Sequence, residues 1–114
     1  MHVEYSPDAL IELKRLPHRE QTAIVSAVEK LEQFGDQLSA PHCSAVKGQR
    51  KTLRELRPRA GRSPWRVFYR RVGDVMVIGA IGPEAMVNPA GFRRSVTDAL
   101  ERIASFEKEG RSNE

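Results

Sequence analysis

Only one of the 114 residues is a cysteine, so the chain cannot form an internal disulfide. Cys43 has no second thiol nearby that would suggest a redox pair or a metal ligand set, and we interpret it as a structural or loop residue. No histidine or cysteine pair has the spacing of metal ligands. We therefore expect no metal site and no cofactor.

Long apolar runs are also missing. A membrane-spanning helix needs roughly 18 apolar residues, whereas the longest run here, from Val75 to Ile81, has the length of a strand. The first residues carry an acid early and lack the basic and then apolar segments of a secretory signal. We expect a cytoplasmic protein that does not bind membranes.

Aromatic residues are few, with one Trp, two Tyr and four Phe, and the sequence has no internal repeat. Hydrophobic residues make up 39% and charged residues 30%, which is typical of a soluble domain with a modest core. The length allows one core rather than two. We predict a single domain over residues 1–107, followed by a polar, frayed tail over residues 108–114.

Acidic residues are scarce in one part of the chain. From Lys47 to Arg71 there are ten Lys or Arg residues against the single acid Glu55, although the net charge is only +4. Such an excess could hold a polyanion. The alternative is that these side chains only keep a sheet edge soluble.

Two helices are predicted after a short extended segment at residues 2–5. Ser6-Pro7-Asp8 has the serine cap, early proline and acid of a helix start. Gly35 offers a stop for the second helix, and Pro17 separates the two, which we expect to form an antiparallel hairpin. Apolar residues recur at helical spacing in both, as Leu10, Leu13 and Leu16 and then as Ile24, Val25, Val28 and Leu31.

Residues 35–51 show no sustained period and are predicted to be a long connection. Three extended runs follow, at residues 52–57, 65–71 and 75–81, with a tight turn at Gly73-Asp74. The third run is apolar on both faces, as in an interior strand. The first run is irregular, because Leu53 and Leu56 cannot share one face without a bulge or a twisted end.

The second run alternates between apolar and basic residues. Trp65, Val67 and Tyr69 should point to one side of the sheet and into the core. Arg66 and Arg70, together with Phe68, should point to the other. This pattern predicts one dry face and one basic face.

A last helix is predicted from Asn88-Pro89. Its apolar stripe consists of Phe92, Val96, Ala99, Leu100 and Ile103, and its outer face, which we interpret as solvated, of Arg93, Arg94, Asp98, Glu101 and Arg102. The elements together predict an α+β fold with an N-terminal strand and helical hairpin, an antiparallel sheet, and a C-terminal helix packed on the sheet. Such an architecture specifies no activity.

The segment from Leu53 to Tyr69 resembles the RelE/ParE toxin superfamily, and most closely its HigB-like, phage-derived branch. That branch carries Glu-Leu-Arg on one strand and aromatic-Arg-Val-aromatic-Tyr on the next, which here are residues 55–57 and 65–69. The order of Pro41, Lys47 and Gly48, the apolar third strand and Asn88-Pro89 extend the resemblance over nearly the whole chain.

The resemblance implies the toxin of a type II toxin–antitoxin system: an mRNA interferase, usually ribosome-dependent, that inhibits translation and is held inactive by an antitoxin, often with a helix-turn-helix. Cleavage through the RNA 2′-hydroxyl needs cations that stabilise the charged phosphorane. We assign this role to Arg57 and Arg66, which neighbouring strands could place on the same side. The residues that we assign to RNA binding are Lys47, Arg50, Lys51, Arg54 and Arg70.

The sequence departs from the branch after the third strand. Relatives commonly have two lysines there, whereas this chain has Pro83-Glu84. A general base is also difficult to identify, because arginine stays protonated near neutral pH. His42 in the long connection and Glu84, if its turn folds over the basic face, are the candidates. Glu55 could instead orient Arg57 or Arg66.

Two further functions therefore stay open. A non-enzymatic domain could inhibit a protein target such as DNA gyrase, as ParE-like proteins do, or could be a relic that still binds its antitoxin. A plain RNA-binding domain would retain RNA in a salt-dependent manner without cleaving it.

Overall fold

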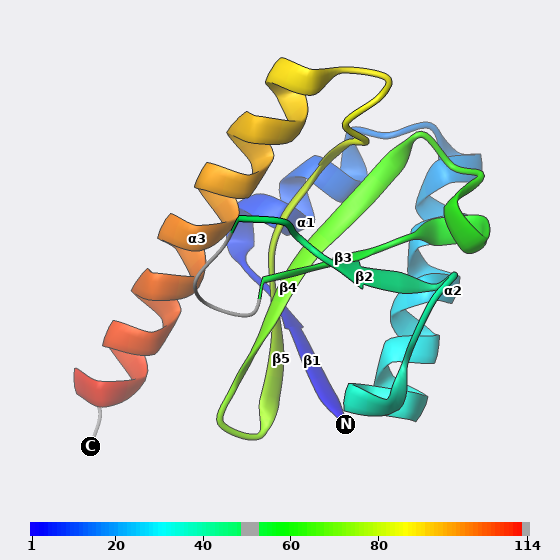
Figure 1. The fold of residues 1–114 in the computed structure, drawn as a ribbon. Coiled ribbons are helices and arrows are strands. Elements are labelled where there is room, and N and C mark those ends of the chain that lie inside the picture. Colours follow the sequence, from blue (N-terminus) through cyan, green and yellow to red (C-terminus); the bar gives the residue numbers. More distant parts are fainter. Residues whose placement is uncertain (49–52, 113–114) are drawn as a thin grey trace.

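The computed structural model describes residues 1–48 and 53–112. It contains a sheet with the strand order β1-β5-β4-β3-β2, in which β1 runs parallel to β5 and the other neighbours are antiparallel. Figure 1 shows the strands and the helices around them. In chain order the elements are β1 (His2–Tyr5), α1 (Pro7–Lys14), α2 (His18–Phe34), the 3-10 turn η1 (Gly35–Gln37), β2 (Cys43–Ala45), β3 (Arg54–Leu56), the 3-10 turn η2 (Pro58–Gly61), β4 (Trp65–Val72), β5 (Val75–Pro83) and α3 (Pro89–Ser112).

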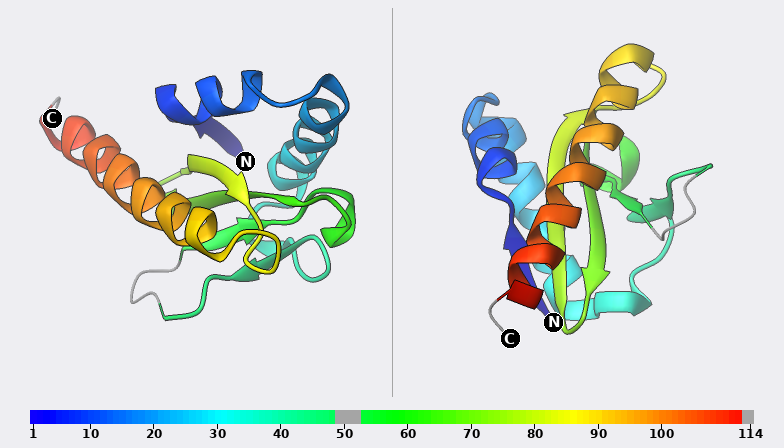
Figure 2. Two further views of the ribbon diagram at one scale, coloured as in Figure 1. Left: turned by 90° about the horizontal axis from the view of Figure 1, so that it is seen from above. Right: turned by 90° about the vertical axis from the view of Figure 1, so that its left-hand side faces the viewer.

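Helices cover both faces of the sheet (Figure 2). On one face, α1 and α2 pack against Leu56, Val67 and Tyr69 to form the first core. On the other, α3 packs against Phe68 and Val77 to form the second core. The sheet thus divides the single core that the chain length led us to expect into two clusters. The predicted α+β fold, with a C-terminal helix on the sheet, is confirmed.

The N-terminal helices begin and end at the predicted signals. Ser6 Oγ accepts a hydrogen bond from the Ala9 N–H, which caps α1. Gly35 ends α2 with a φ of +54°, a conformation that favours glycine. The predicted apolar stripes are wrong at Leu10 and Val25, which are 38% and 42% exposed. The side chains that these helices bury in the first core are instead Ala9 and Leu13 in α1 and Ile24, Ala27, Val28 and Leu31 in α2.

The predicted long connection contains a strand. Residues 43–45 form β2, which pairs with β3 at the edge of the sheet, and the peptide bond before Pro41 is cis. Leu53 and Leu56 need no bulge, because Leu53 belongs to the second core and Leu56 to the first. Regular alternation therefore places them on opposite faces that are both buried.

The prediction of one basic face on β4 is wrong for the same reason. Arg66 and Arg70 do lie opposite Val67 and Tyr69, but both are buried, and α3 covers Phe68 between them. The tight turn at residues 73–74 is confirmed. The interior strand is confirmed as well, and β5 carries one extra residue near Gly79, where its register with β4 shifts.

Helix α3 begins as predicted, with Asn88 Oδ1 accepting a hydrogen bond from the Gly91 N–H. Its apolar stripe lies in the second core. Arg102 is not merely solvated: its guanidinium donates to Glu12 Oε1 and to the Gly79 carbonyl, which ties α3 to α1 and β5. The helix continues to Ser112, beyond the predicted domain boundary at residue 107.

Within residues 1–48 and 53–112, none of the helices is both long enough and apolar enough to cross a bilayer.

Candidate functional site

The chain makes an unusually sharp turn between β3 and β4. Arg59 and Ala60 have φ angles of +56° and +55°, and Gly61 follows with +91°. Left-handed backbone is costly for residues with a Cβ, and such strain is often found at functional sites. The turn brings Gly61 against Arg57, so that a Cβ at position 61 would lie 3.0 Å from Arg57 Nη2.

Arg66 stabilises this turn by hydrogen bonds from its buried guanidinium to backbone carbonyls. It is only 2% exposed, and its Nη1 donates to the carbonyls of Ser63 at 2.7 Å and Trp65 at 2.9 Å. Its Nη2 donates to the Gly61 carbonyl and, at 3.0 Å, to Glu84 Oε2. Burial, followed by the positive charge of Arg57, lowers the pKa of Arg66.

Two carboxylates flank the arginine pair. Glu84 reaches Arg66 because its N–H donates to the Pro64 carbonyl, which folds the segment after β5 back over the start of β4. Glu55 Oε1 lies 3.8 Å from Arg57 Nη1 and accepts a hydrogen bond from Ser44 Oγ at 3.1 Å. The two conditions set by the sequence are thus met: the turn with Glu84 does fold over Arg66, and Glu55 does pair with Arg57.

Arg57 is the more accessible of the two arginines. Its side chain is 34% exposed, and its only ion pair is the long one with Glu55 among the residues that the structure describes. Its Nε is buried and has no hydrogen-bond partner. Arg57 therefore keeps donors that could serve an anion at this surface, whereas the donors of Arg66 are used within the protein.

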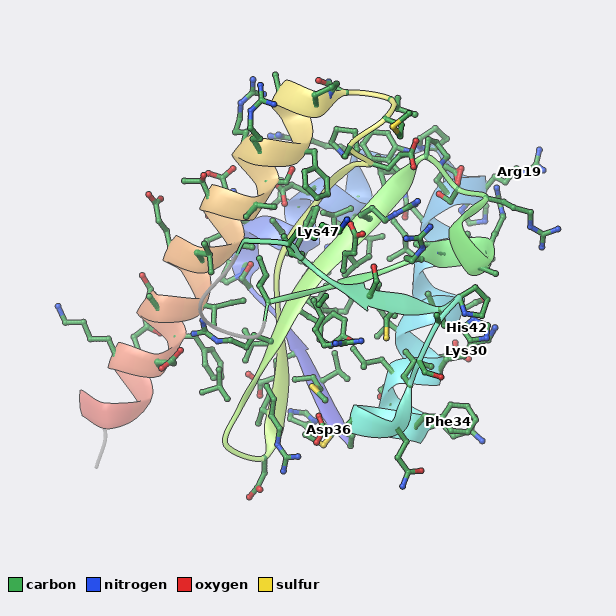
Figure 3. All side chains as sticks on the ribbon, in the orientation of Figure 1. Arg19, Lys30, Phe34, Asp36, His42 and Lys47 are labelled. Carbon is green, nitrogen blue, oxygen red and sulfur yellow. The ribbon has the colours of Figure 1, made fainter. Side chains whose placement is uncertain are left out.

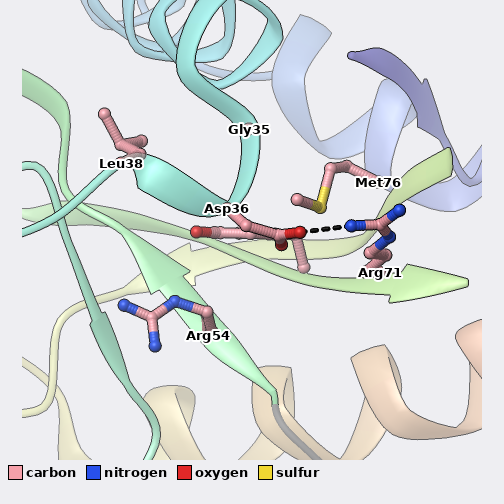
Figure 4. A pocket seen from close by; sticks show the side chains of 7 residues that line it. Gly35, Asp36, Leu38, Arg54, Arg71 and Met76 are labelled. Carbon is pink, nitrogen blue, oxygen red and sulfur yellow. Dashed lines mark hydrogen bonds and ion pairs between the residues drawn. The ribbon is translucent and has the colours of Figure 1, made fainter. Parts of the chain in front are cut away.

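Arg54 lies on the other face of the sheet. Its Nη2 donates to Cys43 Sγ at 3.3 Å, and this hydrogen bond is the main reason that the pKa of Arg54 is raised. With Tyr69 and Arg71 it lines a cavity of about 270 Å³ below η1, where Arg71 pairs with Asp36 (Figure 4). Arg54 is thus separated by the sheet from Arg57 and Arg66.

The remaining predicted RNA-binding residues are dispersed. Arg70 shares the α3 side of β4 with Arg66, but it is buried and paired with Glu107, and burial lowers its pKa. Lys47 is exposed after β2, on the side of α3 (Figure 3). Arg50 and Lys51 lie outside the described residues.

His42 does not enter the cluster. Its backbone carbonyl accepts a hydrogen bond from the Arg57 N–H, and Figure 3 shows its side chain pointing outward where β2 begins. Among the described residues, no hydrogen bond or ion pair joins the His42 imidazole to Arg57 or Glu84.

The basic excess of the sequence is largely compensated in the fold. The structure describes eight of the ten basic residues between positions 47 and 71, since Arg50 and Lys51 fall outside it. Five of the eight form ion pairs with acids, namely Arg57 with Glu55, Arg59 with Glu20, Arg66 with Glu84, Arg70 with Glu107 and Arg71 with Asp36. Four of these acids come from distant parts of the chain, so the sequence alone overstates the positive patch.

Sequence reasoning missed Ser44 and Ser63, which hold Glu55 and Arg66 in place. Neither stands in a recognisable motif. The glycine at position 61 was a usable signal, because a proline-to-glycine turn between two strands often needs a left-handed residue.

Residues 11–78, more than half of the chain, match the family described as "Phage derived protein Gp49-like (DUF891)". The chain belongs to this Gp49-like family. It is a family of RelE-like toxins, and membership implies an antitoxin partner.

A solved structure of another toxin has the same fold as this Gp49-like chain. The E. coli toxin RelE in the free state, in a mutant form with two arginines replaced by alanine, superimposes with a TM-score of 0.63 over 90% of this chain and 96% of RelE. The two are 14% identical, so this likeness concerns the fold. A comparison with curated protein sequences gave no match close enough to name a relative.

Proposed function

We propose that this Gp49-like protein is a HigB-like toxin of a type II toxin–antitoxin system that cleaves mRNA, in the cytoplasm and on the ribosome, and so inhibits translation and growth. Its partner in this proposal is an antitoxin of the helix-turn-helix type. The observation that carries the proposal is the accessible Arg57 guanidinium, with an unpaired buried Nε, held beside Arg66 between two carboxylates.

The reaction that fits these groups is attack of an RNA 2′-oxygen on the adjacent phosphate. The O2′–P bond forms, the P–O5′ bond breaks, and a 2′,3′-cyclic phosphate remains. The phosphorane carries an extra negative charge, which the exposed part of the Arg57 guanidinium can stabilise. Arg66 is a positioning residue in this scheme, because it holds the turn under Arg57 and holds Glu84.

Proton transfer falls to a carboxylate. Glu84 is the candidate acceptor of the 2′-hydroxyl proton, since Arg66 fixes its Oε2 at 3.0 Å on the same side of the sheet as Arg57. The 5′-oxygen then takes a proton from water.

Growth arrest and transcript cleavage after induction in cells test the proposal. Primer extension should reveal new 5′ ends with the unaltered protein and about 10²-fold fewer with Arg57→Ala, the usual loss when one transition-state donor is removed. Arg62→Ala is the matched control, because Arg62 is exposed in the same turn and, within the described part of the chain, its side chain donates only to the Arg59 carbonyl.

Wild-type cleavage by Arg57→Ala, with the soluble protein present at the normal level, would reject the site assignment. Arg66→Ala is less informative, because it would leave Glu84 and three carbonyls, of which that of Ser63 is buried, without their partner and so destabilise the fold.

A second candidate is a non-enzymatic toxin, which inhibits a protein such as DNA gyrase, or a relic that only binds its antitoxin. The compensation of Arg57 and Arg66 by Glu55 and Glu84 favours it, since it reduces the attraction for phosphate. Arrest with intact transcripts and altered supercoiling would select gyrase inhibition, and the absence of arrest would select the relic.

A further inference from the structure

The side of the sheet that carries Arg57 also contains a cavity that borders α3. It has a volume of about 300 Å³ and is lined by Val46, Lys47, Phe92, Arg93, Val96 and Thr97. Ligand pockets range from about 300 to 1,000 Å³, so this one has room for a single small group.

The floor of the cavity is apolar. Val46 and Val96 are buried in the second core, and the Phe92 ring meets Phe68 edge to face, with 5.3 Å between the ring centroids. Such a floor offers a flat apolar surface to a nucleobase.

Two cations form the rim. Lys47 and Arg93 are exposed, and neither has an ion pair or a side-chain hydrogen bond with another described residue. They differ in this from Arg59, Arg66, Arg70 and Arg71, whose guanidinium groups are paired with acids. Unpaired cations beside an apolar floor complement a nucleotide, which presents a phosphate next to a base.

The cavity and the Arg57 cluster lie on the same face of the sheet. Ser44 and Glu55 are hydrogen-bonded neighbours, and Glu55 pairs with Arg57. Val46 lies two residues from Ser44 and, by strand alternation, on the same side of the sheet, and Lys47 follows it. A single-stranded RNA with one phosphate at Arg57 could therefore continue over β2 and β3 to α3.

We infer that this cavity is a second nucleotide-binding subsite for single-stranded RNA, in which the base packs on Phe92 and Val96 and the backbone phosphate contacts Lys47 and Arg93. The inference deepens the proposed function. It adds Arg93 to the RNA-binding residues, although the sequence alone placed Arg93 on a merely solvated face.

Binding of a fluorescein-labelled, single-stranded 2′-O-methyl RNA measures this subsite without cleavage, because the probe lacks the 2′-hydroxyl nucleophile. By fluorescence anisotropy near 0.1 M salt, Lys47→Gln with Arg93→Gln should raise the Kd about tenfold or more. The matched control, Arg15→Gln with Arg94→Gln, removes the same charge outside the cavity: Arg15 is exposed after α1, and Arg94 is the neighbour of Arg93. This control should raise the Kd less than about threefold.

Equal losses in the two double variants would overturn the subsite, as would failure of the unaltered protein to bind the probe. A labelled oligoglutamate separates RNA from an acidic protein segment: if it binds the cavity and loses as much affinity as RNA in the Lys47 and Arg93 variant, the RNA subsite is rejected. Cleavage is measured separately through Arg57→Ala, so the subsite can stand if the nuclease proposal fails.

Discussion

Arg57 and Arg66 carry the same functional group, but their surroundings leave different numbers of their hydrogen-bond donors unpaired. Arg66 donates to three carbonyls and a carboxylate inside the protein. Arg57 lies over Gly61 and keeps a buried Nε without a partner. The Arg57 side chain is 34% exposed, so its guanidinium can still reach an anion at the surface, which Arg66 at 2% exposure cannot.

The turn that supports Arg57 has a strained backbone at Ala60. Ala60 is exposed and has a φ of +55°, a left-handed conformation that glycine adopts without a steric cost. Relief of this cost outweighs the larger conformational entropy that glycine has in the unfolded chain, so Ala60→Gly should stabilise the protein by about 0.5–1 kcal/mol. Urea unfolding measures this. Ala104→Gly on the exposed side of α3 should instead destabilise by a similar amount. Loss of stability in both variants would show that the left-handed backbone stores no strain.

At the scale of elements, α3 is held close to β5 by the absence of a side chain. A Cβ on Gly79 would lie 2.7 Å from the Ala99 carbonyl oxygen and 2.8 Å from Ala99 Cα. Gly79 is also the point at which the register of β5 shifts. The position of α3 on the sheet, and with it the cavity beside Lys47, therefore depends on this glycine.

Gly79→Ala should destabilise the protein by about 1–3 kcal/mol, because backbone atoms of α3 must move to admit the methyl group. Gly110→Ala in the same helix is the control, since nothing lies within 4 Å of its added Cβ, and it should stabilise by up to about 1 kcal/mol. The midpoints of urea unfolding compare the two. A neutral Gly79→Ala variant would mean that α3 can shift freely on β5.

Local signals predicted the elements that have them. The caps at Ser6 and Asn88, the stop at Gly35 and the alternation in β4 are properties of neighbouring residues, and each was found where expected. β2 has three residues and no pattern of its own, because its partner strand defines it. Burial of both sheet faces depends on α3 and could not be read from β4 alone.

The candidate site was predictable to the same extent. Arg57 and Arg66 come together because β3 and β4 are adjacent, which the short turn between them implies. The partners of the basic residues could not be predicted, since Glu20, Glu84 and Glu107 approach only through tertiary folding. The sequence thus located two arginines correctly on one face while giving no sign that one would be buried.

At the scale of the molecule, the two cores differ in their ionisable groups. Both tyrosines of the chain, Tyr5 and Tyr69, pack in or against the first core, between the sheet and the N-terminal helices. Burial, helped by the charge of Glu32, raises the pKa of Tyr5 to about 12. Burial also raises the pKa of Tyr69. The second core has no phenol, so alkaline pH should act on the first.

The stability of the whole fold should therefore fall above pH 10. An unfolded tyrosine ionises near its ordinary pKa of about 10, whereas the folded phenols stay protonated. The unfolded state then binds fewer protons, and the free energy of unfolding decreases as pH rises from 10 towards 12; below pH 10 this stabilisation is fully present. The pH dependence of the free energy of urea unfolding gives the number of protons released on unfolding. This number should be about two for the unaltered chain and about one for Tyr5→Phe. Tyrosinate absorbance of the folded protein provides the independent check, because both phenols should ionise only above pH 10. A Tyr5→Phe variant with an unchanged pH dependence, or early ionisation of both tyrosines, would contradict a protected first core.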